Sequence, residues 1–223
     1  MTLVIAHRGA SAYEVENSLA AFQAARRLGA DGVELDVHLT ADGQPVVHHD
    51  PVAGRFPIFR TALRDLEQHR LANGEPIPTL AQALSLLGTE MEVWIEVKTL
   101  DPRDDVQLLK VLEEGPARLG YHVHAFDHRI VRRLKDHRPQ LDTGVLSASY
   151  PMRPLPPVEE AGATTLWQQE SLLDADLLEQ AHQRGLRVVA WTVDDPDRMR
   201  TLLSLGVDAL CTNRPDVARQ VVG

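Results

Sequence analysis

Short apolar runs rich in β-branched residues recur along the chain and alternate with segments whose apolar residues follow helical spacing. Runs of the first kind predict buried strands, and segments of the second kind predict amphipathic helices. The pattern predicts eight strands, at Leu3–His7, Gly32–Leu39, Glu92–Thr99, Tyr121–Phe126, Thr143–Ser149, Thr164–Gln168, Arg187–Val193 and Asp208–Thr212. Helices are predicted between them, at Ser18–Leu28, Thr79–Leu87, Asp104–Glu114, Asp127–His137, Asp174–Arg184 and Asp195–Leu205.

Strands that alternate with helices indicate a parallel sheet with helical crossovers. Eight such units in 223 residues fit a closed (β/α)₈ barrel, one domain over residues 1–223, better than an open doubly wound sheet, which pattern alone leaves as the alternative. Two segments depart from the rhythm. A short strand within Gln44–His49 is followed by a short loop insertion at about residues 50–73, and the prolines of Pro151–Pro157 predict an extended loop in place of a helix.

Charge and composition exclude several classes of protein. The chain has 23 Lys and Arg against 32 Asp and Glu, a net charge of −9, which argues against a nucleic-acid-binding protein. No uncharged run reaches the roughly 20 residues that span a bilayer, so no transmembrane segment is expected. The N-terminal sequence lacks the features of a signal peptide, and Cys211 is the single cysteine, so we expect a cytoplasmic protein with this thiol buried.

Polar residues gather where the first three predicted barrel strands end, which is where barrel enzymes place their active sites. Residues two apart on a strand point the same way, so pairs of these side chains can face the barrel axis together. Three carboxylates in a packed interior would repel one another unless a cation lay among them, and a hard divalent ion suits oxygen ligands. The alternative interpretation is a set of solvated ends or ion pairs. The residues are His7, Arg8, Glu34, Asp36, Glu96 and Lys98.

Several short motifs, taken in order along nearly the whole chain, resemble the glycerophosphodiester phosphodiesterase family. Each motif alone is a weak signal, but their order together is specific. The motifs are His7-Arg8-Gly9, Glu16-Asn17-Ser18, Glu34-Leu35-Asp36-Val37, Pro45-Val46-Val47-His48-His49-Asp50, Ile77-Pro78-Thr79-Leu80, Ile95-Glu96-Val97-Lys98, Ala190-Trp191-Thr192-Val193 and Asn213-Arg214-Pro215-Asp216.

The resemblance implies a phospholipase-C-like TIM barrel that splits small-molecule glycerophosphodiesters into an alcohol and sn-glycerol 3-phosphate. It also implies a divalent metal ion, Mg²⁺ or Ca²⁺, as cofactor. By position, the resemblance implies Glu34, Asp36 and Glu96 as metal ligands, His7 and His49 as the catalytic pair, Arg8, Asn17 and Lys98 near the phosphate, and Trp191 in the pocket wall.

Two rival functions are weighed against this one. His122 and His124 could serve a zinc-dependent barrel hydrolase of amides or esters, although no third histidine or cysteine matches them and packing is the favoured interpretation. A barrel that only binds phosphorylated polyols is disfavoured, because binding needs no histidine pair. His38 is expected at a solvated position. The sequence leaves open the preferred alcohol and whether the protein forms a homodimer.

Overall fold

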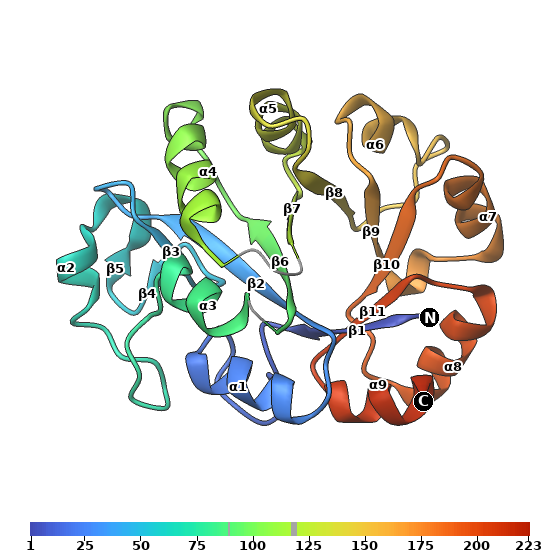
Figure 1. The fold of residues 1–223 in the computed structure, drawn as a ribbon, viewed down its shortest axis with the longest axis horizontal. Helices are drawn as coiled ribbons and strands as arrows, with labels where there is room; N and C mark the ends of the chain where they lie inside the picture. Colours follow the sequence, from blue (N-terminus) through green and yellow to red (C-terminus); the bar gives the residue numbers. More distant parts are fainter. Residues whose placement is uncertain (89, 117–119) are drawn as a thin grey trace.

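The computed structural model describes residues 1–88, 90–116 and 120–223, and its parallel strands close into a barrel (Figure 1). Closure occurs at β1 (Leu3–His7), which pairs in parallel with β2 (Gly32–Leu39) on one side and β11 (Ala209–Thr212) on the other. This confirms the predicted (β/α)₈ barrel and excludes the open sheet. The strands between β2 and β11 are β6 (Glu92–Val97), β7 (Tyr121–Ala125), β8 (Asp142–Ser147), β9 (Thr165–Gln169) and β10 (Arg187–Trp191).

Helices connect the strands around the outside of the barrel, and side-chain caps mark where several begin. The Ser18 side chain accepts the Ala21 N–H at the start of α1, and Thr79 forms a capping box with Gln82. None of the helices in the described part of the chain has the length and apolar character needed to span a bilayer. The helices are α1 (Leu19–Arg27), α3 (Leu80–Leu87), α4 (Asp105–Glu114), α5 (His128–His137), α6 (Pro156–Glu160), α7 (Ala175–Gln183), α8 (Pro196–Leu205) and α9 (Pro215–Val222), with 3₁₀ turns η2 (Pro102–Asp104) and η3 (Glu170–Leu172).

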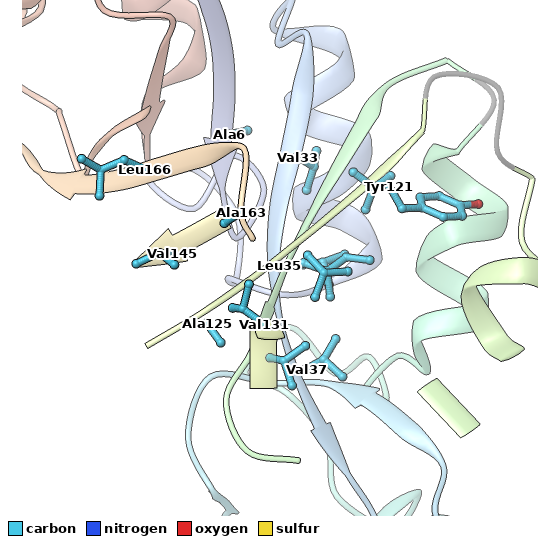
Figure 2. Close-up of a cluster of buried hydrophobic side chains, with 14 of the residues drawn as sticks. Ala6, Val33, Leu35, Val37, Tyr121, Ala125, Val131, Val145, Ala163 and Leu166 are labelled. Carbon is cyan, nitrogen blue, oxygen red and sulfur yellow. The ribbon is translucent and has the colours of Figure 1, made fainter. Parts of the chain in front are cut away.

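Alternation along each strand divides the apolar side chains between two cores. Val33, Leu35 and Val37 of β2 belong to the larger core, which lies between the strands and the helices and is shown in Figure 2. Residues of the opposite parity form a smaller cluster inside the barrel, where Trp94 meets Trp167 edge to face at 5.4 Å. Because these indoles fill the interior, the barrel has a packed centre.

The segment between β2 and α3 contains more structure than the predicted short strand and loop insertion. It holds β3 (Pro45–Val47), β4 (Val52–Ala53), β5 (Phe56–Pro57), η1 (Ile58–Arg60) and α2 (Leu63–Leu66). The antiparallel pairing of β3 with β2 confirms the short strand. The remainder packs on a small core of its own, and the Asp42 carboxylate accepts the Leu63 N–H at 3.0 Å. The segment is therefore anchored to the end of β2, beside the predicted site.

The prediction of an extended loop over Pro151–Pro157 is wrong for its last two residues, which are helical. Helix α6 begins at Pro156 and continues to Glu160. Proline is tolerated in the first helical turn, where its missing N–H would have no partner, so Pro156 and Pro157 start a helix instead of preventing one. Helix α9, near the C-terminus, was not predicted either.

The close approach of Gly9 to α1 generates a stability prediction. Gly9 has φ +82°, and a Cβ there would lie 2.7 Å from the backbone carbonyl carbon of Ala21. Gly43 also has positive φ, +72°, but a Cβ there would meet no described atom within 4 Å. We expect Gly43→Ala to cost about 1 kcal/mol from backbone conformation alone, and Gly9→Ala to cost about 1–3 kcal/mol more from overpacking. Urea unfolding of both variants measures this difference, and equal losses would contradict it.

Candidate active site at the carboxyl end of the barrel

The polar ends of β1, β2 and β6 meet at one mouth of the barrel. In the strand register, Glu34 lies beside His7 of β1, and Asp36 lies beside Glu96 of β6. Glu34, Asp36 and Glu96 are all buried, with exposed fractions of 2%, 0% and 8%. The structure therefore brings three carboxyl groups together out of water, as their spacing along the strands predicts.

Burial and neighbouring charges shift the pKa values of these three carboxyl groups. Burial raises the pKa of Glu34 well above the ordinary value, and the charges of Asp36 and Glu96 raise it further. Burial also raises the pKa of Glu96, with Asp36 adding to it. Burial acts in the same direction on Asp36, but Arg8 and Lys98 outweigh it, so the pKa of Asp36 lies below its ordinary value. The repulsion is thus relieved at Asp36 and remains at Glu34 and Glu96.

Two basic side chains border the carboxylates. Arg8 Nε lies 3.2 Å from Asp36 Oδ2, and Lys98 Nζ lies 3.3 Å from Asp36 Oδ1. Lys98 Nζ also lies 2.6 Å from Glu96 Oε1, and Arg8 Nη1 lies 3.0 Å from the more exposed Glu16. Arg8 and Lys98 are largely buried, so their charges act in a medium of reduced dielectric constant. They supply positive charge to this mouth of a protein whose net charge is −9.

The loop after β1 adopts an unusual backbone to reach these positions. Arg8 and Asn17 have φ angles of +54° and +57°, in the left-handed region that disfavours residues other than glycine. Arg8 N–H donates to Glu34 Oε2 at 3.0 Å, and Asn17 N–H donates to Arg8 O at 3.0 Å. The Asn17 amide donates to Asp36 Oδ2 at 2.8 Å. These bonds stabilise the strained loop, and they assign Asn17 a direct contact with Asp36.

His124 of β7 lies beside the carboxylates, although the sequence pattern favoured a packing role for it. Glu34, Glu96 and His124 each offer one ligand atom, and these atoms lie within 4.8 Å of one another, so the group can hold a metal ion. The His124 ring stacks on Trp167 at 4.1 Å, and its Nδ1 is buried with no hydrogen-bond partner among the described residues. Burial lowers the pKa of His124 to about 3, so the imidazole is neutral and keeps a lone pair. The sequence feature that could have indicated this role is the position of His124 near the carboxyl end of β7.

His122, its predicted companion in the zinc interpretation, lies at the opposite end of the barrel. It stacks on Trp94 at 3.7 Å and contacts Glu92 at 3.3 Å and Asp142 at 3.1 Å. Glu92 and Asp142 are the first residues of β6 and β8. The two histidines therefore form no shared site, and the zinc interpretation loses its ligand pair.

The predicted catalytic histidines occupy different surroundings. His7 Nδ1 lies 2.8 Å from Asn213 Oδ1, and burial, followed by the Arg8 charge, lowers the pKa of His7. His49 is more exposed, and its Nδ1 lies 2.9 Å from Asp50 Oδ1. The His49 carbonyl accepts a hydrogen bond from His38 Nε2 at 3.1 Å. His38 is buried, so its prediction as a solvated residue is wrong; it supports the backbone of His49.

Two hollows lie in this region. A small cavity inside the barrel mouth is lined by His7, Glu34, Glu96, His124, Leu146, Trp167, Trp191 and Cys211. Trp191 thus borders the carboxylates, and Cys211 is buried as predicted. A second hollow of about 520 Å³ is lined by residues adjoining the site in sequence, among them His38, Pro51, Phe59 and Thr99. The first is close to the charged groups, and the second is large enough for an organic substituent.

Comparison with known proteins identifies the family. The model of the glycerophosphoryl diester phosphodiesterase family matches residues 7–217. The chain belongs to the glycerophosphoryl diester phosphodiesterase family. A glycerophosphodiester phosphodiesterase of Caldanaerobacter subterraneus subsp. tengcongensis is 32% identical, with 99% of this chain and 98% of the relative covered. The resemblance carried by the sequence motifs is therefore confirmed.

Solved structures agree with this family membership. A phosphodiesterase of Oleispira antarctica, in complex with the product sn-glycerol-3-phosphate, superposes with a TM-score of 0.92 at 26% identity, covering 100% of this chain and 97% of that one. A glycerophosphodiester phosphodiesterase of Thermotoga maritima shares the fold, with a TM-score of 0.80 at 24% identity and coverage of 100% and 98%. Both structures share the barrel fold of this chain.

Burial of Glu34 generates a prediction about pH in chelator-treated buffer. Because its pKa is higher in the folded than in the unfolded chain, the folded protein binds the extra proton, and the free energy of unfolding falls as pH rises above 4.5. Each such carboxyl contributes a slope of at most about 1.4 kcal/mol per pH unit. Glu34→Gln should flatten this fall at pH values above about 5, measured by urea unfolding. The exposed Glu179 of α7 provides the control, and a Glu34→Gln profile identical to that of Glu179→Gln would refute the prediction.

Proposed function

We propose that this protein hydrolyses glycerophosphodiesters to an alcohol and sn-glycerol 3-phosphate, as a phosphoric diester hydrolase. The observation that carries the proposal is the barrel mouth where buried Glu34 and Glu96 lie together with Arg8 and Lys98. A phosphodiester anion needs concentrated positive charge, and the carboxylates can hold a divalent ion that adds to the two basic residues. The names of the relatives support the same reaction.

For the metal ion we propose Glu34, Asp36 and Glu96 as ligands and Mg²⁺ or Ca²⁺ as the ion. The residues fit such an ion because burial raises the pKa of both Glu34 and Glu96, and neighbouring carboxylates raise each further, a repulsion that a cation would remove. Oxygen ligands favour Mg²⁺ and Ca²⁺, whereas the imidazole of His124 would favour zinc or another transition metal. When bound, the ion would neutralise charge on the phosphoryl oxygens. The choice between Asp36 and His124 as third ligand thus decides the class of ion.

For the substrate we propose that Arg8 and Lys98 bind the phosphate, with Asn17 beside them and Trp191 along the glycerol. The Arg8 guanidinium is planar and suits two phosphate oxygens at once. Asn17 orients Asp36 through its amide. The departing alcohol would occupy the hollow of about 520 Å³ that includes Pro51, two residues beyond His49.

For the chemistry we propose His7 as general base and His49 as general acid. The glycerol 2-hydroxyl oxygen attacks phosphorus and gives its proton to His7, while the bond from phosphorus to the alcohol oxygen breaks and His49 donates a proton to that oxygen. Water then opens the cyclic phosphate with the proton transfers reversed. The low pKa of buried His7 keeps it neutral and able to accept a proton.

The proposed reaction is tested by assaying glycerol 3-phosphate release from glycerophosphocholine with and without a chelator. Chelation should abolish release, and Mg²⁺ or Ca²⁺ should restore it. Asp36→Asn should weaken the binding of that ion in a calorimetric titration by about tenfold or more, whereas His124→Gln should leave it within about twofold. Restoration by zinc alone, with the sensitivity at His124, would favour the zinc hydrolase. Glycerophosphocholine binding without turnover would favour the polyol-binding barrel.

The two histidine roles are tested by leaving-group quality. On glycerophosphocholine, His7→Ala and His49→Ala should each lose roughly 10² to 10⁴ in kcat, the usual contribution of a general acid or base. A nitrophenolate leaves without a proton, so on a glycerophospho-nitrophenyl ester His49→Ala should recover much of its loss and His7→Ala should not. The reverse pattern would exchange the roles. Equal losses on both esters would reject the division between acid and base.

A further inference from the structure

A chain of hydrogen bonds runs from the loop after β10 through the end of β11 to His7. Asp194 Oδ2 accepts a hydrogen bond from Asn213 Nδ2 at 2.6 Å, and Asn213 Oδ1 lies 2.8 Å from His7 Nδ1. Ser11 Oγ also lies 2.7 Å from Asn213 Oδ1. His7 and Asn213 are 206 residues apart in sequence and meet only because β1 pairs with β11.

Asp194 determines which way the Asn213 amide faces. Its carboxylate accepts from the backbone N–H of Asn213 at 2.8 Å and from Thr212 Oγ1 at 2.9 Å, both through Oδ1. An ionised carboxylate only accepts hydrogen bonds, so its Oδ2 requires the NH₂ end of the Asn213 side chain. The opposite orientation would set two acceptor oxygens 2.6 Å apart. The amide oxygen therefore faces His7.

The orientation of this amide in turn determines the tautomer of His7. An amide oxygen accepts and cannot donate, so a hydrogen bond at this distance requires the proton on His7 Nδ1. In a neutral ring the lone pair is then on Nε2. His7 lines the small cavity that Glu34 and Glu96 also line, and Nε2 is the ring nitrogen free to act there.

We propose that Asn213, oriented by Asp194, is a positioning residue that holds His7 in the tautomer protonated on Nδ1 and so leaves Nε2 to accept the proton from the substrate hydroxyl. The role of His7 as base rests on the function proposed above; the tautomer does not. Asn213 touches no reacting atom and acts through His7, in the manner of the carboxylate that orients histidine in other hydrolytic sites.

The test exchanges the two side chains. In Asp194→Asn the introduced amide can keep its oxygen on Thr212 and the Asn213 N–H, which leaves its NH₂ group facing the NH₂ of Asn213. We expect Asn213 to turn, present its NH₂ group to His7 Nδ1 and move the ring proton to Nε2. In the double variant Asp194→Asn with Asn213→Asp, the NH₂ group donates to the new carboxylate, which again accepts from His7 Nδ1. The double variant should restore the wild-type tautomer.

The readout is the ¹⁵N spectrum of histidine-labelled protein with Mg²⁺, in which each ring nitrogen reports whether it carries a proton. The chain has 10 histidines, so His7 is assigned by the signals that His7→Gln removes. We expect Nδ1–H in wild type, loss of that state in Asp194→Asn and Asn213→Ala, and its return in the double variant. A wild-type ring protonated on Nε2, or a tautomer unchanged in Asp194→Asn, would overturn the proposal.

Kinetics separate positioning from folding and from the proposed function. Asp194→Asn should lower kcat on glycerophosphocholine about 10²-fold with KM within about twofold, and the double variant should recover at least a tenth of wild-type kcat. Equal kcat losses in single and double variants, with equal losses of melting temperature, would indicate a structural role and overturn the proposal. If the ring proton of His7 moves as expected while kcat stays at the wild-type value, His7 is rejected as the base. The assignment of its tautomer would then stand.

Discussion

Burial of like charge at one mouth of the barrel is the constraint on which the site depends. Glu34, Asp36 and Glu96 are held within a wall of paired strands and have little access to water. Carboxylates in such a place either take up protons or recruit cations. The protein has two cations against Asp36 and leaves Glu34 and Glu96 with raised pKa values. One further cation at this mouth would relieve the repulsion that remains.

The same constraint explains the unusual backbone after β1. A residue other than glycine in the left-handed region is destabilised by roughly 1–2 kcal/mol, and such strain persists only where surrounding bonds over-determine it. Arg8 is in that region because its N–H donates to Glu34, and Asn17 because its N–H and its amide bind Arg8 and Asp36. The carboxylates therefore order the loop that carries Arg8, one of the two cations paired with Asp36. The strained backbone of this loop and the buried carboxylates of the site therefore depend on the same hydrogen bonds.

Features that repeat locally along the chain could be predicted from the sequence, and features created by barrel closure could not. Alternation of strand and helix predicted the barrel, and the i, i+2 spacing in β2 and β6 predicted the grouped carboxylates. The burial of His38 depends on the backbone of His49, in the segment that folds back over β2. The contact of His7 with Asn213 joins the first strand to the last. No local pattern encodes either contact.

His122 and His124 show how position along a strand, and not residue type, decides what a side chain does. Both point into the barrel from β7, and each stacks on an indole, Trp94 or Trp167. Burial opposes charge on both rings, but Asp142 and Glu92 outweigh it at His122 and raise that pKa, whereas His124 stays neutral. The ion pairs of His122 with Glu92 and Asp142 lie at the amino end of the barrel. His124, two residues further along, reaches the carboxyl end of the barrel. There it lies beside Glu34 and Glu96, whose repulsion is not relieved, and the three side chains together can hold a metal ion.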